Sequence, residues 1–197
     1  FEDFQNTHAF ELLHRWQEKI ACFNDDIQGT ASVSVTGLYS AMRVKGEKLS
    51  DQRVLFLGAG SAATGIAHLI ADAMAEEGLP REEALKRIAL VDSKGLVSKN
   101  RGDTLADNKV PFAHDLPTAQ SLIEAVRLFK PTALIGVSAQ AKAFTKEVIE
   151  EMSALNERPI IYALSNPTSK AECTAQEAYQ WSKGKAIFAS GSPFAPV

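Results

Sequence analysis

The chain is 197 residues long, which suits one α/β domain, and its 45 % hydrophobic and 23 % charged residues exclude disordered, fibrous and membrane compositions. A net charge of −3 with scattered Lys and Arg excludes a basic face for nucleic acid. Because no apolar stretch reaches about 18 residues and no signal peptide opens the chain, we expect no membrane partner and a location in the cytoplasm or an organelle matrix.

Two helices are predicted before the first strand. The first begins near Asn6 or Thr7, either of which can cap it, and its apolar residues recur at three- to four-residue spacing as far as Ile20. A loop over 21–27 and a second amphipathic helix over 28–45 follow. The chain opens inside folded sequence and without Met, so we expect a fragment of a longer polypeptide.

Five continuous apolar runs follow, separated by helical stretches. Strands buried on both faces of a parallel sheet have this pattern, because βαβ crossovers cover both faces. The sequence therefore predicts an α/β fold, with a Rossmann-type, doubly wound, mainly parallel sheet that is flanked by helices and preceded by two helices. We expect a single domain over 1–197, with a helical lead-in over 1–50 and the Rossmann core over 51–197. The runs are 54–57, 88–91, 133–137, 160–164 and 186–189.

A glycine-rich turn of the form G-x-G-x-x-A follows the first predicted strand and opens the next helix. The first glycine permits a tight turn, the second lets a pyrophosphate approach the backbone, and the alanine lets the helix pack closely on the strand. An isolated turn of this kind only joins a strand to a helix. Here the flanking strand and helix, with Asp92 closing the next strand, favour an NAD(P) site at the helix N-terminus. The turn comprises Gly58, Ala59, Gly60, Ser61, Ala62 and Ala63.

The residues around Asp92 bear on the choice between NAD and NADP. An acidic residue that ends the second strand binds the adenosine ribose and favours NAD. Asp92 lies farther along than the usual ~20 residues, because 76–86 adds helix or loop. Ser93 and the cations that follow could bind the additional phosphate of NADP, or could form a solvated basic loop. We expect NADP, with NAD possible. The cations are Lys94, Lys99, Arg101 and Lys109.

Two acidic pairs, Glu2-Asp3 and Asp25-Asp26, lie at the edges of predicted elements. Carboxylate oxygens are hard ligands that suit Mg²⁺ or Mn²⁺. Adjacent acids are also common at helix N-termini, where they interact favourably with the helix dipole. Spacing alone therefore leaves a metal site and a helix-terminal role both open.

Six segments, in the same order and over essentially the whole chain, resemble malic enzymes. Long, ordered motifs of this kind are far more specific than the glycine turn alone. The resemblance implies a Rossmann-type NAD(P)-binding domain from a divalent-metal-dependent oxidative decarboxylase. The segments are 1–4, 23–30, 58–65, 156–159, 164–168 and 188–194.

The resemblance also implies roles for particular residues. Glu2, Asp3 and Asp26 would ligate the divalent metal, and Asp25 would assist catalysis through a supporting hydrogen bond. Asn166 would contact the substrate and the cofactor. The other implied cofactor-binding residues are the turn residues 58–63, Asp92, Ser93, Lys109 and Ser138.

The activity that the resemblance implies is conversion of malate to pyruvate and CO₂ with reduction of NAD(P). Hydride leaves C2 of malate, and the enolate that remains after loss of CO₂ is stabilised by the cation. Malic enzymes carry a catalytic Lys and Tyr and a substrate-binding Arg upstream, and an Asn-Asn segment downstream, and none of these can be matched here. We therefore expect a missing N-terminal catalytic domain, an inactive isolated chain and, in the full enzyme, a homodimer or homotetramer.

Three alternatives remain open. A malolactic enzyme would carry the same residues and would show no net reduction of the cofactor. The cofactor domain of an amino-acid dehydrogenase would explain neither residues 23–30 nor the acidic pairs. A non-catalytic dinucleotide-binding module would be encoded at this length, with a start codon next to Phe1.

Overall fold

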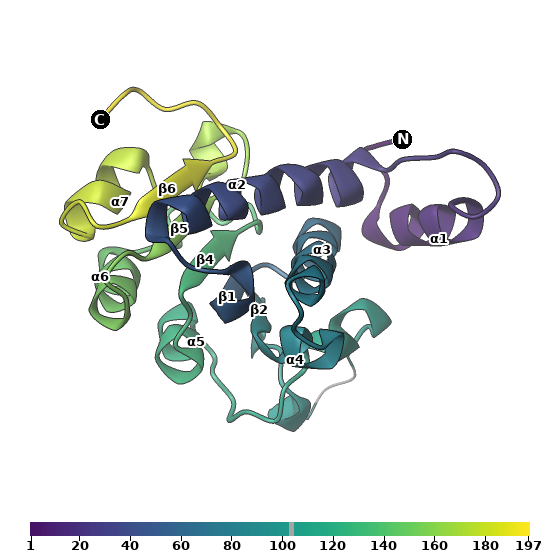
Figure 1. Cartoon of the computed structure of the whole chain (residues 1–197), viewed down its shortest axis with the longest axis horizontal. Helices are drawn as coiled ribbons and strands as arrows, with labels where there is room; N and C mark the ends of the chain where they lie inside the picture. Colours follow the sequence, from purple (N-terminus) through teal and green to yellow (C-terminus); the bar gives the residue numbers. More distant parts are fainter. Residues whose placement is uncertain (103–104) are drawn as a thin grey trace.

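A six-stranded sheet forms the centre of the molecule, in the computed structural model that describes residues 1–102 and 105–197 (Figure 1). The strand order is β3-β2-β1-β4-β5-β6, and every neighbouring pair is parallel except β2 and β3. The predicted doubly wound, mainly parallel sheet is therefore confirmed. The strands are β1 (Val54–Leu57), β2 (Ile88–Asp92), β3 (Gly95–Leu96), β4 (Ala133–Gly136), β5 (Ile160–Ala163) and β6 (Ile187–Ser190).

Helices cover both faces of the sheet, and alternate residues of each strand point into separate cores. Val54 and Phe56 of β1 face one core, which α2 and α3 complete. Leu55 and Leu57 face the other, which α5, α6 and α7 complete. The strands are therefore apolar on both faces because helices cover both faces of the sheet, as the sequence indicated. The helices are α1 (Asn6–Trp16), α2 (Thr30–Lys45), α3 (Ser61–Glu76), α4 (Arg81–Lys86), α5 (Leu122–Phe129), α6 (Lys146–Leu155) and α7 (Ala175–Trp181).

The two N-terminal helices pack differently from each other. Helix α2 lies across the sheet, and Val35, Leu38 and Met42 belong to the same core as β1 (Figure 1). Within the predicted lead-in over 1–50, α2 thus forms a layer that packs on the sheet. Helix α1 projects away from the sheet, ends at Trp16 and does not reach Ile20, which is 57 % exposed.

The stretch between β2 and α5 contains short elements that the pattern of apolar residues did not predict. The two-residue strand β3 pairs antiparallel with β2, and short 3₁₀ turns cover Lys99–Arg101 (η3) and Asp107–Phe112 (η4). These turns return the chain to the carboxyl end of β2. No helix in the described part of the chain is long and apolar enough to cross a membrane.

Candidate dinucleotide and metal site

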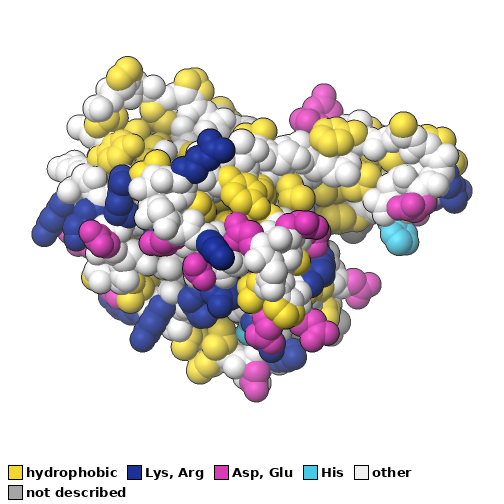
Figure 2. Space-filling view, in the orientation of Figure 1, with side chains coloured by type: hydrophobic (Ala, Val, Ile, Leu, Met, Phe, Trp, Pro, Cys, Tyr) yellow, Lys and Arg dark blue, Asp and Glu magenta, His cyan; other side chains and the backbone are white. Residues whose placement is uncertain are grey.

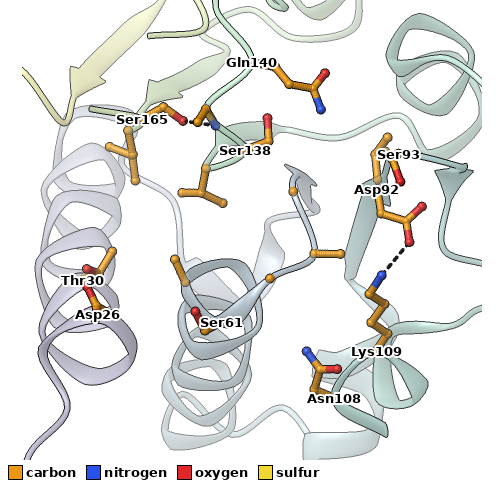
Figure 3. A pocket seen from close by; sticks show the side chains of 18 of the residues that line it. Asp26, Thr30, Ser61, Asp92, Ser93, Asn108, Lys109, Ser138, Gln140 and Ser165 are labelled. Carbon is orange, nitrogen blue, oxygen red and sulfur yellow. Dashed lines mark hydrogen bonds and ion pairs between the residues drawn. The ribbon is translucent and has the colours of Figure 1, made fainter. Parts of the chain in front are cut away.

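A groove of about 1020 Å³ lies outside the carboxyl ends of β1, β2, β4 and β5 (Figure 3). Strand β1 has β2 on one side and β4 on the other, so the chain crosses to opposite sides of β1 here. Open α/β sheets bind ligands at such a switch point. The groove is lined by Asp3, Phe4, Gln5, Asp26, Thr30, residues 58–62, Val91, Asp92, Ser93, Ala106, Asn108, Lys109, residues 137–140 and residues 164–166.

The glycine turn forms the middle of the groove. Gly58 has a φ of 126°, and a Cβ there would lie 2.9 Å from the carbonyl oxygen of Val137. Helix α3 starts at Ser61, so the N–H groups of its first turn face the groove. Five of the six predicted turn residues line the groove. The exception, Ala63, is 1 % exposed and packs in the core against the strand.

Asp92 lies at one end of the groove and accepts four hydrogen bonds. Arg101 donates through Nη1 to Oδ1 (2.7 Å) and through Nη2 to Oδ2 (3.1 Å). The Lys109 Nζ donates to Oδ2 (2.7 Å), and the Lys94 amide N–H donates to Oδ1 (2.9 Å). A carboxylate offers about four acceptor positions. The four donors therefore saturate Asp92 (Figure 3 shows the contact with Lys109).

Two cationic side chains and one carboxylate meet at this end of the groove. Burial raises the pKa of Asp92, but hydrogen bonds from Arg101 and Lys109 outweigh this effect and hold the pKa below its usual range. The carboxylate stays ionised at neutral pH, and the three side chains together carry one net positive charge. Ser93, which was predicted to bind cofactor, lines the groove next to them.

The opposite end of the groove is formed by the loops that follow β4 and β5. Ser138 and Asn166, both predicted from the sequence, line this end. The Ala139 amide N–H donates to the Ser165 Oγ (2.9 Å) and joins the two loops (Figure 3). Sequence reasoning missed Ser165 and Gln140. Their position just after apolar strand runs was the available signal, since carboxyl ends of parallel strands meet at one edge.

Three hydrogen bonds, two between main-chain groups and one to a carboxylate, bring the two acidic pairs together. The Phe1 ammonium donates to the Phe23 carbonyl oxygen (2.8 Å), and the Asp25 amide N–H donates to the Phe1 carbonyl oxygen (3.1 Å). The Asp3 amide N–H then donates to the Asp26 Oδ2 (2.8 Å). Asp3 and Asp26 consequently line the same groove as the glycine turn.

A divalent metal is only partly accommodated by this arrangement. Asp3 and Asp26 supply the oxygen donors that Mg²⁺ and Mn²⁺ prefer. Across residues 1–102 and 105–197, however, no three His, Cys, Asp or Glu side chains gather closely enough to hold an ion. Glu2 and Asp25 are exposed and lie outside the groove lining. The expected set of Glu2, Asp3 and Asp26 is therefore not assembled in this chain, and the role of Asp25 stays a prediction.

A close helix contact places Asp26 beside the glycine turn. Asp26 belongs to a π-helical turn, η1 (Asp25–Gly29), where the sequence predicted the end of a loop. A Cβ on Gly65 of α3 would lie 2.9 Å from both Cγ2 and the carbonyl oxygen of Ile27. Only a residue without a side chain at this position allows η1 to approach α3 so closely. Gly65 thus has a structural role that its sequence context did not reveal.

The strand order, the glycine turn, the acid at the end of β2 and the groove define a dinucleotide-binding domain of the type used by nicotinamide-dependent oxidoreductases. A family model described as "Malic enzyme, NAD binding domain" matches residues 27–197. The chain therefore belongs to the malic enzyme family, as its NAD-binding domain.

Individual relatives agree with this assignment. The NADP-dependent malic enzyme of Rattus norvegicus is 59 % identical, and NADP-dependent malic enzyme 3 of Arabidopsis thaliana is 58 % identical, each over 100 % of this chain. The chain spans 34 % of the length of each of them. The crystal structure of the NAD-dependent malic enzyme of Thermotoga maritima is similar with a TM-score of 0.79 at 26 % identity, over 96 % of this chain and 47 % of that chain.

Proposed function

We propose that this chain binds NADP for a malic enzyme that oxidises and decarboxylates malate, acting together with further polypeptide. The saturation of Asp92 carries the cofactor assignment. An NAD-binding acid must accept hydrogen bonds from the ribose hydroxyls. All the acceptor positions of Asp92 are taken, so a ribose diol would have to displace a donor.

A phosphate on the ribose would instead use the donors around Asp92. Lys109 contacts one oxygen of Asp92 only, whereas Arg101 contacts both. Lys109 can therefore transfer to a 2′-phosphate while Arg101 keeps the carboxylate paired. A charge-assisted hydrogen bond of this kind contributes about 1.5–3 kcal/mol.

Calorimetric titration of this chain with NADP⁺ and with NAD⁺ at fixed salt tests the assignment, because phosphate contacts are screened by salt. We expect NADP⁺ to bind more tightly. Lys109→Gln should weaken NADP⁺ by about ten- to a hundredfold and leave NAD⁺ within about twofold. Lys146→Gln, which removes one charge from an exposed i,i+4 ion pair on α6, is the matched control. Tighter binding of NAD⁺ by the unaltered chain would overturn the assignment.

The remaining residues of the groove have separate tasks in this proposal. The N-terminus of α3 binds the pyrophosphate, and Asn166 donates to malate or to the nicotinamide amide. Asp3 and Asp26 would help to hold Mg²⁺ or Mn²⁺, which supplies a Lewis acid for the developing enolate charge. Glu2 would complete the ligand set in the full enzyme.

The isolated chain is not expected to oxidise malate. Among the described residues that line the groove, the titratable side chains are Asp3, Asp26, Asp92 and Lys109, and the last two are paired with each other. Because this proposal assigns Asp3 and Asp26 to the metal, the base for the C2 hydroxyl comes from further polypeptide. Malate-dependent reduction of NADP⁺ in proportion to the concentration of this chain would contradict the expectation.

Exposed aromatic side chains support docking of that further polypeptide near the acids. Phe1, Phe4 and Phe23 are 41–51 % exposed, next to the hydrogen bonds that hold Asp3 near Asp26. Figure 2 shows hydrophobic side chains at the same projecting N-terminal end. A surface of this kind marks an interaction site.

A further inference from the structure

A buried carboxylate lies behind the β4–β5 end of the groove. Glu172 is 0 % exposed and belongs to the segment that connects β5 to α7. Its side chain covers the last residue of β4, since a Cβ on Gly136 would overlap Cγ, Cδ and Oε1 of Glu172. No ion pair to Glu172 is found over residues 1–102 and 105–197.

Within the described residues, the hydrogen bonds to this side chain come from neutral donors in the groove. The Ser165 Oγ donates to Oε1 (2.5 Å), the Ser138 amide N–H donates to Oε1 (3.4 Å), and the Ser165 amide N–H donates to Oε2 (3.4 Å). The Ser165 Oγ also accepts from the Ala139 amide N–H, so this one hydroxyl links Glu172 to the loop after β4.

The main chain around Glu172 also ties the two loops together. The Phe144 amide N–H donates to the Glu172 carbonyl oxygen (3.0 Å), and the Lys142 amide N–H donates to the Ala171 carbonyl oxygen (3.0 Å). Glu172 thus fixes the loop after β4 against the loop after β5. The hydroxyl oxygen of Ser138, a residue that lines the groove, is buried at the same place and has no hydrogen-bond partner within the described residues.

The position of the nicotinamide follows from the other parts of the groove. The ribose phosphate belongs at Asp92 and Lys109, and the pyrophosphate belongs at the N-terminus of α3. The remaining end, at Ser138 and Ser165, is on the other side of the glycine turn (Figure 3). The nicotinamide ring of NADP⁺ carries a positive charge, which the reduced ring lacks.

We propose that Glu172 is a positioning residue for the nicotinamide. It holds Ser138 and Ser165 against each other, and its buried, unpaired negative charge favours the oxidised, cationic ring over the reduced one. This inference rests on the proposed dinucleotide site. A buried charge acts through a lower effective dielectric constant than a surface charge and is screened less by salt. The site thereby binds NADP⁺ in preference to NADPH.

Titration of the unaltered chain and of Glu172→Gln with NADP⁺ and NADPH tests the proposal. Glutamine is nearly isosteric and can still accept from Ser165, but it carries no charge. We expect the ratio of the NADPH to the NADP⁺ dissociation constant to fall at least about threefold in Glu172→Gln. Glu157→Gln removes an equal, exposed charge near the opposite end of β5 and should leave the ratio unchanged.

Ser165→Ala distinguishes the effect of the Glu172 charge from the effect of the hydrogen bonds that position the loops. It can also be measured if Glu172→Gln does not fold. It removes the hydroxyl donor and keeps the carboxylate, so both affinities should fall while their ratio stays within about twofold. An unchanged ratio in folded Glu172→Gln, or a ratio that falls in Ser165→Ala, would overturn the role of the charge. Binding of neither cofactor by the unaltered chain would instead refute the proposed dinucleotide site.

Discussion

Arg101 contacts both carboxylate oxygens of Asp92, at 2.7 and 3.1 Å, in a fork whose side chains are only 9 % and 12 % exposed. Planar guanidinium groups match carboxylates in this two-bond arrangement. The contact joins the turn η3 to the end of β2, so it organises the loop at the adenosine end of the groove.

Replacement of Arg101 by Met should destabilise the chain by about 1–3 kcal/mol, because a buried acceptor loses two charge-assisted hydrogen bonds while Lys109 remains. Arg127→Met is the matched control, since Arg127 also contacts carboxylates, Glu147 and Glu151, but is 52 % exposed. Exposed pairs contribute little to stability, because water and salt screen them. Urea unfolding of the two variants measures the difference. Equal losses would show that burial does not strengthen the Arg101 contact.

Acid should selectively remove the contribution of Asp92. Its pKa is lowered in the folded chain, so its stabilisation is complete above the unfolded carboxyl pKa of about 3.9 and is lost as the pH falls from there through the lower folded value. The free-energy difference between the unaltered chain and Asp92→Asn should therefore be constant from pH 7 to about pH 5 and shrink below about pH 4. A difference that grows in acid would contradict the sign of this shift.

Substitutions of Gly58 and Gly78 by Ala distinguish the cost of backbone strain from the cost of steric overlap. Both have positive φ, 126° and 96°, but a Cβ on Gly58 would meet the Val137 carbonyl at 2.9 Å whereas nothing lies within 4 Å of one on Gly78. Gly78→Ala should cost about 1–2 kcal/mol from strain alone. Gly58→Ala should cost roughly 1 kcal/mol or more in addition and should also weaken NADP⁺ binding. Chemical denaturation of both variants measures this, and similar losses would refute the role of the overlap.

The two cysteines should differ in reactivity. Burial, with Glu177 and Glu172 nearby, raises the pKa of Cys173 to about 12, whereas Cys22 is half-buried. Only the thiolate attacks a disulfide reagent. A colorimetric thiol assay at pH 8 should therefore detect one fast thiol in the folded chain and two after unfolding. Cys22→Ser should abolish the fast reaction, and a fast reaction that persists in this variant would contradict the assignment.

The sequence was sufficient for the five parallel strands and for most of the residues that line the groove. The five apolar runs became the five parallel strands β1, β2, β4, β5 and β6, because burial on both faces leaves a signal within each segment. The glycine turn was equally local, since strand, turn and helix are consecutive. Of the predicted cofactor residues, only Ala63 lies outside the groove lining, and it supports the packing that the motif assigns to it.

The tertiary structure decided how the residues of the site are paired. Asp92 was found from its place after β2, but its saturation depends on Lys109, which lies 17 positions away and returns through a long loop. Glu172 accepts a hydrogen bond from Ser138 across 34 positions. Gly65 of α3 leaves room for the close approach of Ile27, which belongs to η1. Side chains that meet across such separations leave no periodicity in the sequence, because their contact is created only when both faces of the sheet are covered. Residue types therefore indicated which kinds of contact the site could make, and the packing determined which side chains make them.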